Sequence, residues 1–223
     1  MNLRETQKFL KENGTAQNRK IFMRHGASEP LYGVSFAQLN KLQKKIKIDH
    51  ALALKLWKTG NMDCRTLALK VADPDQLTIS LVEGWVKASD YKVLAGELAD
   101  LVSRSPLADS RMKKWMKSKK EFIRKAGYDL LSCRLVGGDE SLPDDLSPVI
   151  TAIEKEIHAS PDLARHAMVM ALISIGIYRP KLESRVLKAA DRIEPVKVDH
   201  GKTGCKTPEI APYIVRARKH RKK

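Results

Sequence analysis

The sequence has few aromatic residues, few cysteines and no long apolar run. Phe, Trp and Tyr together make up 5% of the 223 residues, so the core has to come mainly from Leu, Ile, Val and Ala. The three cysteines, Cys64, Cys133 and Cys205, are far apart and odd in number. This argues against a disulfide framework and against a zinc knuckle. We therefore expect buried or incidental thiols in a reducing compartment, and neither a metal nor another cofactor.

No apolar stretch approaches the length needed to cross a bilayer, and the N-terminus lacks the apolar core of a signal peptide. We therefore expect a cytoplasmic protein that does not enter a membrane. Alternation with period two is also nearly absent, and only the Val-Lys-Val at 196–198 could be extended. A chain of this length can bury a substantial core and fits one domain or one short solenoid.

Acidic residues are too few to balance the basic ones. The sequence has 42 Lys and Arg against 26 Asp and Glu, a formal net charge of +16. The last eight residues, RARKHRKK, contain six of the Lys and Arg, so the rest of the chain still carries +10 (16 minus 6). A protein this basic is a candidate for binding a polyanion, usually nucleic acid. Solubility and attraction to acidic lipids are alternatives that charge alone leaves open.

The clearest periodic pattern lies in Leu31–Asp73, which predicts three helices joined by short turns. Apolar residues recur there at helical spacing, and Gly60-Asn61 and Asp73-Pro74 act as stop signals. The inward positions that we expect are Val34, Phe36, Leu39, Leu42 and Ile46, then Ala51, Leu54 and Trp57, then Leu67, Ala68 and Val71. Each helix has one apolar face and is stable only when neighbours stack on it, as in a solenoid.

The same spacing continues through most of the chain and predicts an all-α fold of roughly ten to twelve helices with short connections. Repeats of roughly 35–45 residues fit HEAT-like stacking. We expect one helical-repeat domain over 1–198 and a tail over 199–223. The tail begins with a Gly- and Pro-containing loop that packs through Ile210 and Tyr213, and it ends in a disordered basic arm. Asp199, His200 and Cys205 lie close together there but match no metal motif.

Three short motifs carry a family resemblance. Tyr-Gly-Val at 32–34, Leu-Trp at 56–57 and Arg-Thr-Leu-Ala at 65–68 resemble the opening repeats of the AlkD-type DNA alkylation-repair family. The resemblance extends over roughly Leu31–Ile193. It implies a HEAT-like solenoid whose concave basic groove holds double-stranded DNA, and we expect a monomer. Known members are glycosylases that excise N3- and N7-alkylated purines. A carboxylate and two Trp residues serve the sugar, and an Arg holds the backbone.

The positions that the resemblance implies for this chemistry are largely replaced. The Trp-x-x-x-Asp motif of the family falls on Tyr91 and Ala95, and Ala95 supplies neither charge nor a base. The Arg falls on Lys125, which keeps the charge but loses bidentate geometry, and Arg124 beside it is a possible substitute. The second Trp and its Arg fall on Met170 and Ile173. The candidate catalytic positions that remain are Tyr91, Arg124 and Lys125.

No other carboxylate is expected to replace the lost one. Residues 91, 94, 95, 98 and 102 share one helix face and read as a core stripe, whereas Glu97 and Asp100 point elsewhere. Asp90 is most simply a helix N-cap. The tryptophans Trp57, Trp85 and Trp115 lie among apolar residues and are expected to pack in the core.

The basic character of the family is better preserved. Residues 111–125, RMKKWMKSKKEFIRK, hold eight basic residues and one acid, with several Lys on one or two neighbouring helix faces. Such side chains contact phosphates without reading the sequence, although an isolated Lys run is more often a solvated face. The predicted nucleic-acid contacts are Lys113, Lys114, Lys117, Lys120, Arg124, Lys125, Lys202, Lys206, Arg216 and Arg218.

Three functions are therefore open. The first is a DNA-repair-associated protein that binds duplex or damaged DNA while the usual glycosylase residues are replaced. The second is an active alkylpurine DNA glycosylase with a non-standard site. The third is a helical-repeat scaffold that binds another protein in its groove. The sequence favours the first.

Overall fold

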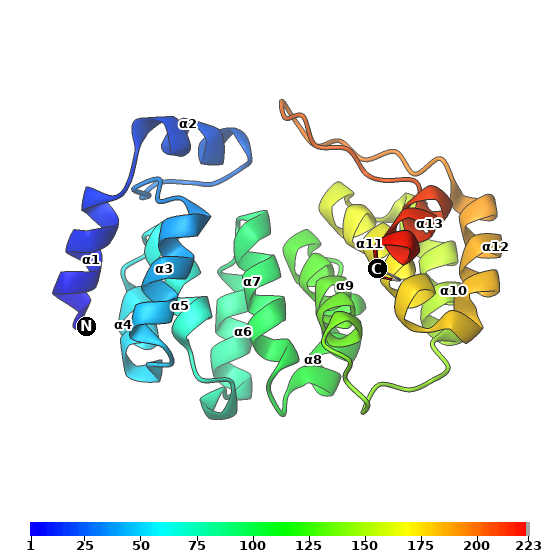
Figure 1. The fold of residues 1–223 in the computed structure, drawn as a ribbon, viewed down its shortest axis with the longest axis horizontal. Coiled ribbons are helices and arrows are strands. Elements are labelled where there is room, and N and C mark those ends of the chain that lie inside the picture. The colour runs from blue at the N-terminus through cyan, green and yellow to red at the C-terminus, as the bar shows by residue number, and fades with distance from the viewer. Residues whose placement is uncertain (222–223) are drawn as a thin grey trace. The chain divides into compact units, whose positions relative to one another are not determined.

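The computed structural model describes residues 1–221, and within them the regular secondary structure is helical (Figure 1). The chain divides into two compact units. The first comprises residues 1–107 together with 201–203, and the second comprises 108–200 and the residues from 204 onward. The all-α prediction is confirmed, whereas a single domain over 1–198 with a separate tail stays a prediction. Across residues 1–221 no helix is long and apolar enough to span a bilayer.

The first unit is built around α5, which packs against α3, α4 and α7. Its α-helices are α1 (Leu3–Glu12), α2 (Ala16–Arg24), α3 (Phe36–Ile46), α4 (His50–Lys58), α5 (Met62–Val71), α6 (Ile79–Lys87) and α7 (Lys92–Ser103). Side-chain oxygens of Ser35, Asp49 and Asn61 accept backbone N–H bonds at the starts of α3, α4 and α5. These caps explain where the predicted helices begin, because each satisfies an amide that the helix itself leaves unpaired.

The Tyr-Gly-Val motif has a structural role in this unit. The N–H groups of Tyr32, Gly33 and Val34 donate to the buried carboxylate of Asp63 at 2.5, 3.1 and 2.9 Å. Gly33 has a φ of +80°, and a Cβ there would lie 2.6 Å from the backbone of Arg19 and of Thr15. The motif therefore fastens the loop before α3 to the first turn of α5, and the turn requires glycine.

The core of the first unit follows the predicted stripes with two departures. Phe36 was predicted to point inward but is 39% exposed, because it is the first residue of α3 and lines a pocket instead of packing in the core. Trp57 and Trp85 are buried and stack with ring centroids 4.8 Å apart, as expected of packing residues. On α4, however, Leu52, Ala53 and Leu56 are buried, whereas Ala51 is exposed and Leu54 is only half-buried. The inward positions of Ala51 and Leu54 were therefore wrong, because in this Leu- and Ala-rich helix the apolar residues cover more than one face.

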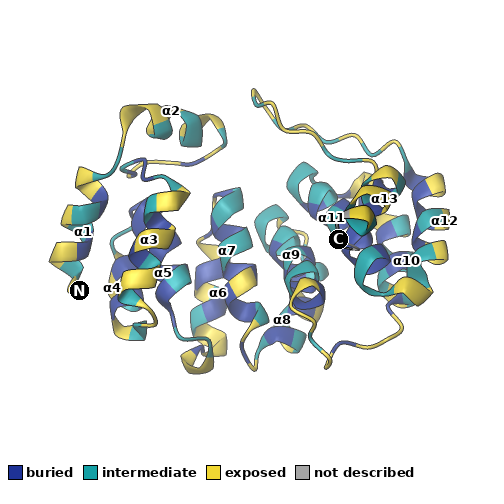
Figure 2. Cartoon of the chain, viewed as in Figure 1, coloured by how far each residue is buried: buried dark blue, intermediate teal, exposed yellow. Residues whose placement is uncertain are grey.

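The second unit is centred on α11, which packs against α9, α12 and α13. Its α-helices are α8 (Ala108–Met116), α9 (Glu121–Val136), α10 (Ser147–Glu156), α11 (Asp162–Tyr178), α12 (Glu183–Ile193) and α13 (Ile210–Arg221). Buried residues surround much of α11, whereas α3 of the first unit shows a broad exposed side (Figure 2). Gly127 of α9 lets α8 approach closely, since a Cβ there would lie 2.4 Å from the backbone nitrogen of Met116.

The tail differs from the prediction. Its end is the regular helix α13 rather than a loop with a disordered arm, although residues 222 and 223 lie outside the described part. Ile210 and Ile214, four residues apart, are 0% and 1% exposed, whereas Tyr213 is only half-buried. The helix forms because this apolar pair packs with α11 and α12, a tertiary contact that the preceding Gly and Pro residues concealed.

Candidate nucleic-acid interface

The basic face of α8 is fixed by the apolar residues on its other side. Ala108, Met112 and Trp115 are buried, so the lysines between them point into solvent. Lys113, Lys114 and Lys117 are all exposed. Lys113 forms an ion pair with Asp109 one turn earlier, Nζ to Oδ2 2.7 Å, while Lys117 has no ion pair among the described residues. An exposed ion pair of this kind contributes little, so Lys113 can exchange partners.

The turn from α8 to α9 adds another exposed cation. The Lys120 N–H donates to Ser118 Oγ at 3.1 Å, and the Lys120 side chain is exposed. In the first turn of α9, Glu121 instead accepts the N–H of Leu163 at 2.9 Å and so caps α11. Glu121 is thus used within the fold, and the lysines of α8 and of the turn are the charges that face solvent.

Arg124 and Lys125 of α9 are held differently from the α8 lysines. Arg124 is ion-paired with Glu156 of α10, and Lys125 is ion-paired with Asp129 on its own helix. Both basic side chains are only 12% exposed. Each would have to give up part of its ion pair to contact a phosphate or a substrate. Their predicted roles toward DNA and in catalysis stay predictions.

The remaining predicted contacts lie in the loop after α12 and on α13. Lys202 and Lys206 are exposed in the loop. The loop is fastened at Thr207, whose hydroxyl lies 3.0 Å from His166 Nδ1 and 2.9 Å from His200 Nε2.

On α13 the two predicted arginines have partners within the second unit. Arg218 pairs with Glu183, and Arg216 lies 5.9 Å from the centre of the Tyr213 ring. Within residues 1–221 no cluster of three His, Cys, Asp or Glu residues is arranged to hold a metal ion.

The positions implied for glycosylase chemistry on α7 lie in the core. Tyr91 is 5% exposed and Ala95 is 0% exposed, and Leu94, Leu98 and Val102 are fully buried beside them. Burial raises the pKa of Tyr91 to about 12, with a smaller contribution from the negative charge of Asp63. The core stripe predicted for this helix is confirmed. Tyr91 therefore offers a buried ring and a protonated hydroxyl rather than an accessible acid or base.

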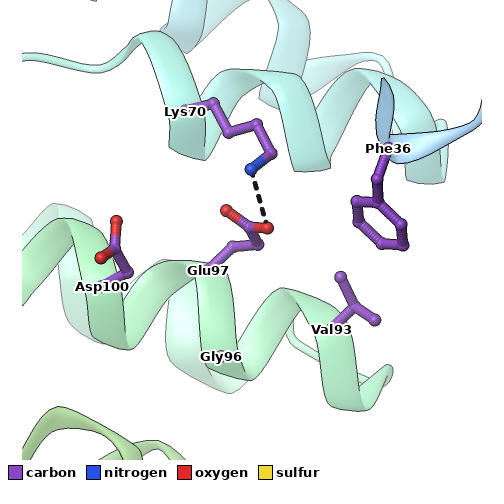
Figure 3. A pocket seen from close by; sticks show the side chains of 6 residues that line it. All are labelled: Phe36, Lys70, Val93, Gly96, Glu97 and Asp100. Atoms are coloured by element: carbon purple, nitrogen blue, oxygen red, sulfur yellow. Dashed lines mark ion pairs between the residues drawn. The ribbon is translucent and has the colours of Figure 1, made fainter. Parts of the chain in front are cut away.

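The opposite side of α7 lines a pocket that the sequence did not reveal (Figure 3). Phe36 of α3 and Lys70 of α5 lie across from four residues of α7 around a volume of about 520 Å³. The α7 residues in the lining are Val93, Gly96, Glu97 and Asp100. Glu97 points toward Lys70 and forms an ion pair with it at 2.9 Å.

Two observations define what this pocket offers chemically. Asp100 also pairs with Arg104, Oδ2 to Nη2 3.1 Å, so both carboxylates of the lining have a basic partner. Phe36 is 39% exposed and adds an aromatic side chain. Carboxylates beside an aromatic ring accommodate a cationic group. The sequence contains one signal of this pocket. Val93 and Glu97 on the solvent side of α7 have the same four-residue spacing as Tyr91 and Ala95 on its buried side.

A solved structure has the same fold as this chain. It is described as "a new family of proteins related to the HEAT-like repeat DNA glycosylases with affinity for branched DNA structures", and the match has a TM-score of 0.88. The match covers 99% of this chain and 95% of the other at 24% sequence identity. At this identity the likeness shows the fold, and the prediction of a HEAT-like repeat fold is confirmed. The concave basic groove stays a prediction.

Two curated relatives come from Listeria. The uncharacterized protein Lin0241 of Listeria innocua is 29% identical over 205 residues, which are 89% of each chain. The uncharacterized protein Lmo0209 of Listeria monocytogenes is 28% identical over 209 residues, or 91% of each chain. The family model described as DNA alkylation repair enzyme matches residues 6–209. The chain thus belongs to the DNA alkylation repair enzyme family, as the opening motifs predict.

Proposed function

We propose that this protein binds DNA, with a preference for branched or distorted structures, and that it does not excise bases through the usual residues of its family. The lysines of α8 and of the α8–α9 turn contact the phosphate backbone. No base-specific contact is needed, because branched and distorted DNA differ from duplex in shape and in deformability.

The charge of the chain and its relationships support DNA binding. The net charge is +16, and Lys117 and Lys120 are exposed and have no ion pair among the described residues. The family is one of DNA repair, and the structural neighbour is described as having affinity for branched DNA. Lysine ammonium groups bind phosphates as point charges, so they tolerate the uneven backbone path of a branch point.

The burial of Ala95 is the observation that carries the second half of the proposal. A glycosylase has to bring a carboxylate to the sugar, and the position implied for it holds a methyl group that is 0% exposed. Neighbouring Tyr91 is buried as well, at 5% exposed. Neither a sugar nor an attacking water reaches this side of α7 without opening the core of the first unit.

The test is binding to labelled DNA by fluorescence anisotropy over a salt series. A four-way junction, a three-way junction and a duplex of the same composition are compared. We expect tighter binding to the junctions and a steep loss of affinity with salt for all three. Equal affinity for junction and duplex would remove the preference, and affinity that does not change with salt would remove the phosphate-contact mechanism.

The pocket of Figure 3 favours a second candidate function, which is base excision through Glu97. Glu97 lies four residues after Val93 and lines a pocket that also holds an exposed aromatic ring. A carboxylate at this place stabilises a cationic sugar in the transition state. Its ion pair with Lys70 opposes this role, because the ammonium repels a second positive charge. If base excision through Glu97 is the function, Glu97→Gln abolishes base release. If the protein only binds DNA, Glu97→Gln does not change base release.

A further inference from the structure

A second, smaller pocket lies in the second unit, among α8, α9 and α10. Its volume is about 280 Å³. Apolar residues form most of the lining, with Met116 from α8, Tyr128 from α9, and Pro148, Val149 and Ala152 from α10. Lys113, Lys117 and Glu156 complete the rim. A pocket just below the size range of small-molecule sites, with an apolar floor, fits one large apolar side chain.

The apolar lining is open to solvent. Pro148 is exposed, and Met116, Val149 and Ala152 are half-buried, whereas the Tyr128 ring beneath them is 2% exposed. The residues come from three helices that are separate in the sequence, so the pocket is a product of the packing rather than of one amphipathic helix. Exposed apolar surface with a polar rim is typical of an interaction site.

The charge of the rim selects the partner. Lys113 and Lys117 are one turn apart on α8 and therefore lie on the same side of the helix, although Lys113 shares its charge with Asp109. Glu156 adds little negative charge, because it is ion-paired with Arg124. Lys114 and Lys120, both exposed, extend the positive charge beyond the pocket. The surface thus combines an apolar anchor site with a surplus of positive charge.

We propose that this pocket docks an acidic peptide segment of another protein, with one Phe or Leu side chain in the pocket and its carboxylates on the α8 lysines. A DNA backbone satisfies the lysines but has no group to fill the apolar floor. An unstacked base also fits poorly, since the Tyr128 ring is covered and presents no stacking face. The peptide uses both features, and its anchor residue supplies most of the binding free energy.

Under this proposal the lysines of α8 bind two kinds of partner, an acidic peptide and DNA. A peptide bound here covers Lys113 and Lys117, which we also assign to phosphate contact. Peptide and DNA therefore compete for α8, while Lys202 and Lys206 in the loop after α12 remain available to DNA. The inference itself rests only on this pocket and its rim, so it stands or falls independently of the preference for branched DNA.

The experiment uses the full-length protein and a short fluorescent peptide of Glu and Ser with one central Phe. Two control peptides have Ser in place of Phe, or Lys in place of Glu. We expect the first peptide to bind most tightly, with affinity at least about tenfold weaker for both the Ser control and the Lys control. Equal binding of the Phe and Ser peptides would overturn the proposal, because the lysines alone would then explain the interaction.

Two protein variants and one control locate the site. Val149→Asp places a carboxylate on the pocket floor, and Lys117→Glu reverses a rim charge on an exposed side chain. Lys188→Glu makes the same charge change on exposed Lys188 of α12, which is not part of the lining. We expect about a tenfold loss of peptide affinity for the first two and little change for the third. Thermal unfolding checks that Val149→Asp is folded, and Lys117→Glu tests the site even if it is not.

A DNA oligonucleotide then separates the two kinds of partner. Under the proposal, Val149→Asp loses the peptide and keeps most of its DNA affinity, because the floor contacts only the anchor side chain. If Val149→Asp retains full peptide affinity, the pocket is not the docking site. If it loses DNA affinity as strongly as peptide affinity, the surface is a nucleic-acid site and the proposal is wrong.

Discussion

The polar residues of α7 in the first unit and of α8 in the second unit are used in different ways. On α7 the solvent side presents two carboxylates, and each has a basic partner within the same unit. On α8 the solvent side presents lysines, and Lys117 has no ion pair in the described part of the chain. Tyr91 and Ala95, two positions that the resemblance implies for chemistry, lie in the core of the first unit, whereas the lysines of α8 are exposed in the second. The proposed loss of catalysis at Tyr91 and Ala95 and the proposed phosphate contacts of the α8 lysines therefore concern separate residues and can be separated by mutation.

The largest effect is expected from returning a carboxylate to α7 at Ala95. Ala95→Asp buries a carboxylate at a position that is 0% exposed and is surrounded by apolar side chains of the core. We expect the free energy of unfolding to fall by about 4 kcal/mol or more, without any gain of base release. Val93→Asp also introduces an aspartate, two residues away on the pocket side. There we expect the free energy of unfolding to fall by less than about 1 kcal/mol.

Urea unfolding followed by circular dichroism measures both variants. If Ala95→Asp is as stable as Val93→Asp, the two sides of α7 are not distinguished by burial. The contrast between the buried side of α7, where the resemblance implies a catalytic carboxylate, and the pocket side would then fail. Base release by a folded Ala95→Asp protein would be still stronger evidence against it.

A smaller effect is expected at the buried arginine of the second unit. Arg134 is 2% exposed and donates to Asp139 at 2.6 Å and to Ser141 at 2.9 Å. The Ser141 hydrogen bond and then Arg134 lower the pKa of Asp139 from 3.8 to about 2, against the opposing effect of burial. We expect Asp139→Asn to lower the free energy of unfolding at neutral pH by about 1–2 kcal/mol, after allowance for solvent screening.

The pH dependence checks the sign of this contribution. The folded-state pKa of Asp139 lies below its ordinary value, so the ionised carboxylate stabilises the fold above about pH 4. The stabilisation is lost as the pH falls through about 2. The difference between wild type and Asp139→Asn should therefore shrink from pH 4 to pH 2, with exposed Asp144→Asn as a control. A difference that stays constant over this range would contradict the assignment.

The two units are compared directly by removing two lysines from each. We expect Lys117→Gln with Lys120→Gln to weaken junction binding about tenfold at low salt and to reduce the slope of log affinity against log salt by about 1.8. Lys41→Gln with Lys44→Gln removes the same charge from exposed positions of α3 in the first unit, and we expect a smaller loss. Equal losses for the two pairs would show that net charge, rather than the α8–α9 segment, determines binding.

The smallest effect is expected at Glu97. Glu97→Gln removes one charge of the pair with Lys70, whose side chains are 20% and 13% exposed. We expect a change in stability of about 1 kcal/mol or less, no change in junction binding and no effect on base release. A defect in base release measured by chromatography would move the active site to the pocket of Figure 3.

Local pattern was enough to predict the elements and most of the inward residues. The stripe at Tyr91, Leu94, Ala95, Leu98 and Val102 was predicted and is buried, because a helix of ordinary length determines which residues share a face. The exposed lysines of α8 follow from the same argument. Tyr-Gly-Val was one of the three motifs that carry the family resemblance, and the structure explains it as the partner of Asp63.

Contacts between distant segments could not be predicted from the sequence. Nothing local pairs Arg124 with Glu156, which lies thirty-two residues later, so Arg124 was predicted to be available to DNA. Arg134 gave no sign of its burial, because one of its partners, Asp109 of α8, lies twenty-five residues earlier in the sequence. The pocket of Glu97 needs α3, α5 and α7 together, and the helical tail needs the surface of α11. These features depend on tertiary packing, which overrides local propensity.

Under the proposed function, this member of a DNA repair family binds DNA without excising alkylated bases. The most direct measurement is single-turnover release of 3- and 7-alkylpurines from a methylated duplex with protein in excess. The bound fraction of the same DNA is followed in the same samples across a salt series. We expect salt-sensitive binding with release no faster than the spontaneous rate. Release above the spontaneous rate would contradict the proposed function and would direct the search for a catalytic carboxylate to Glu97.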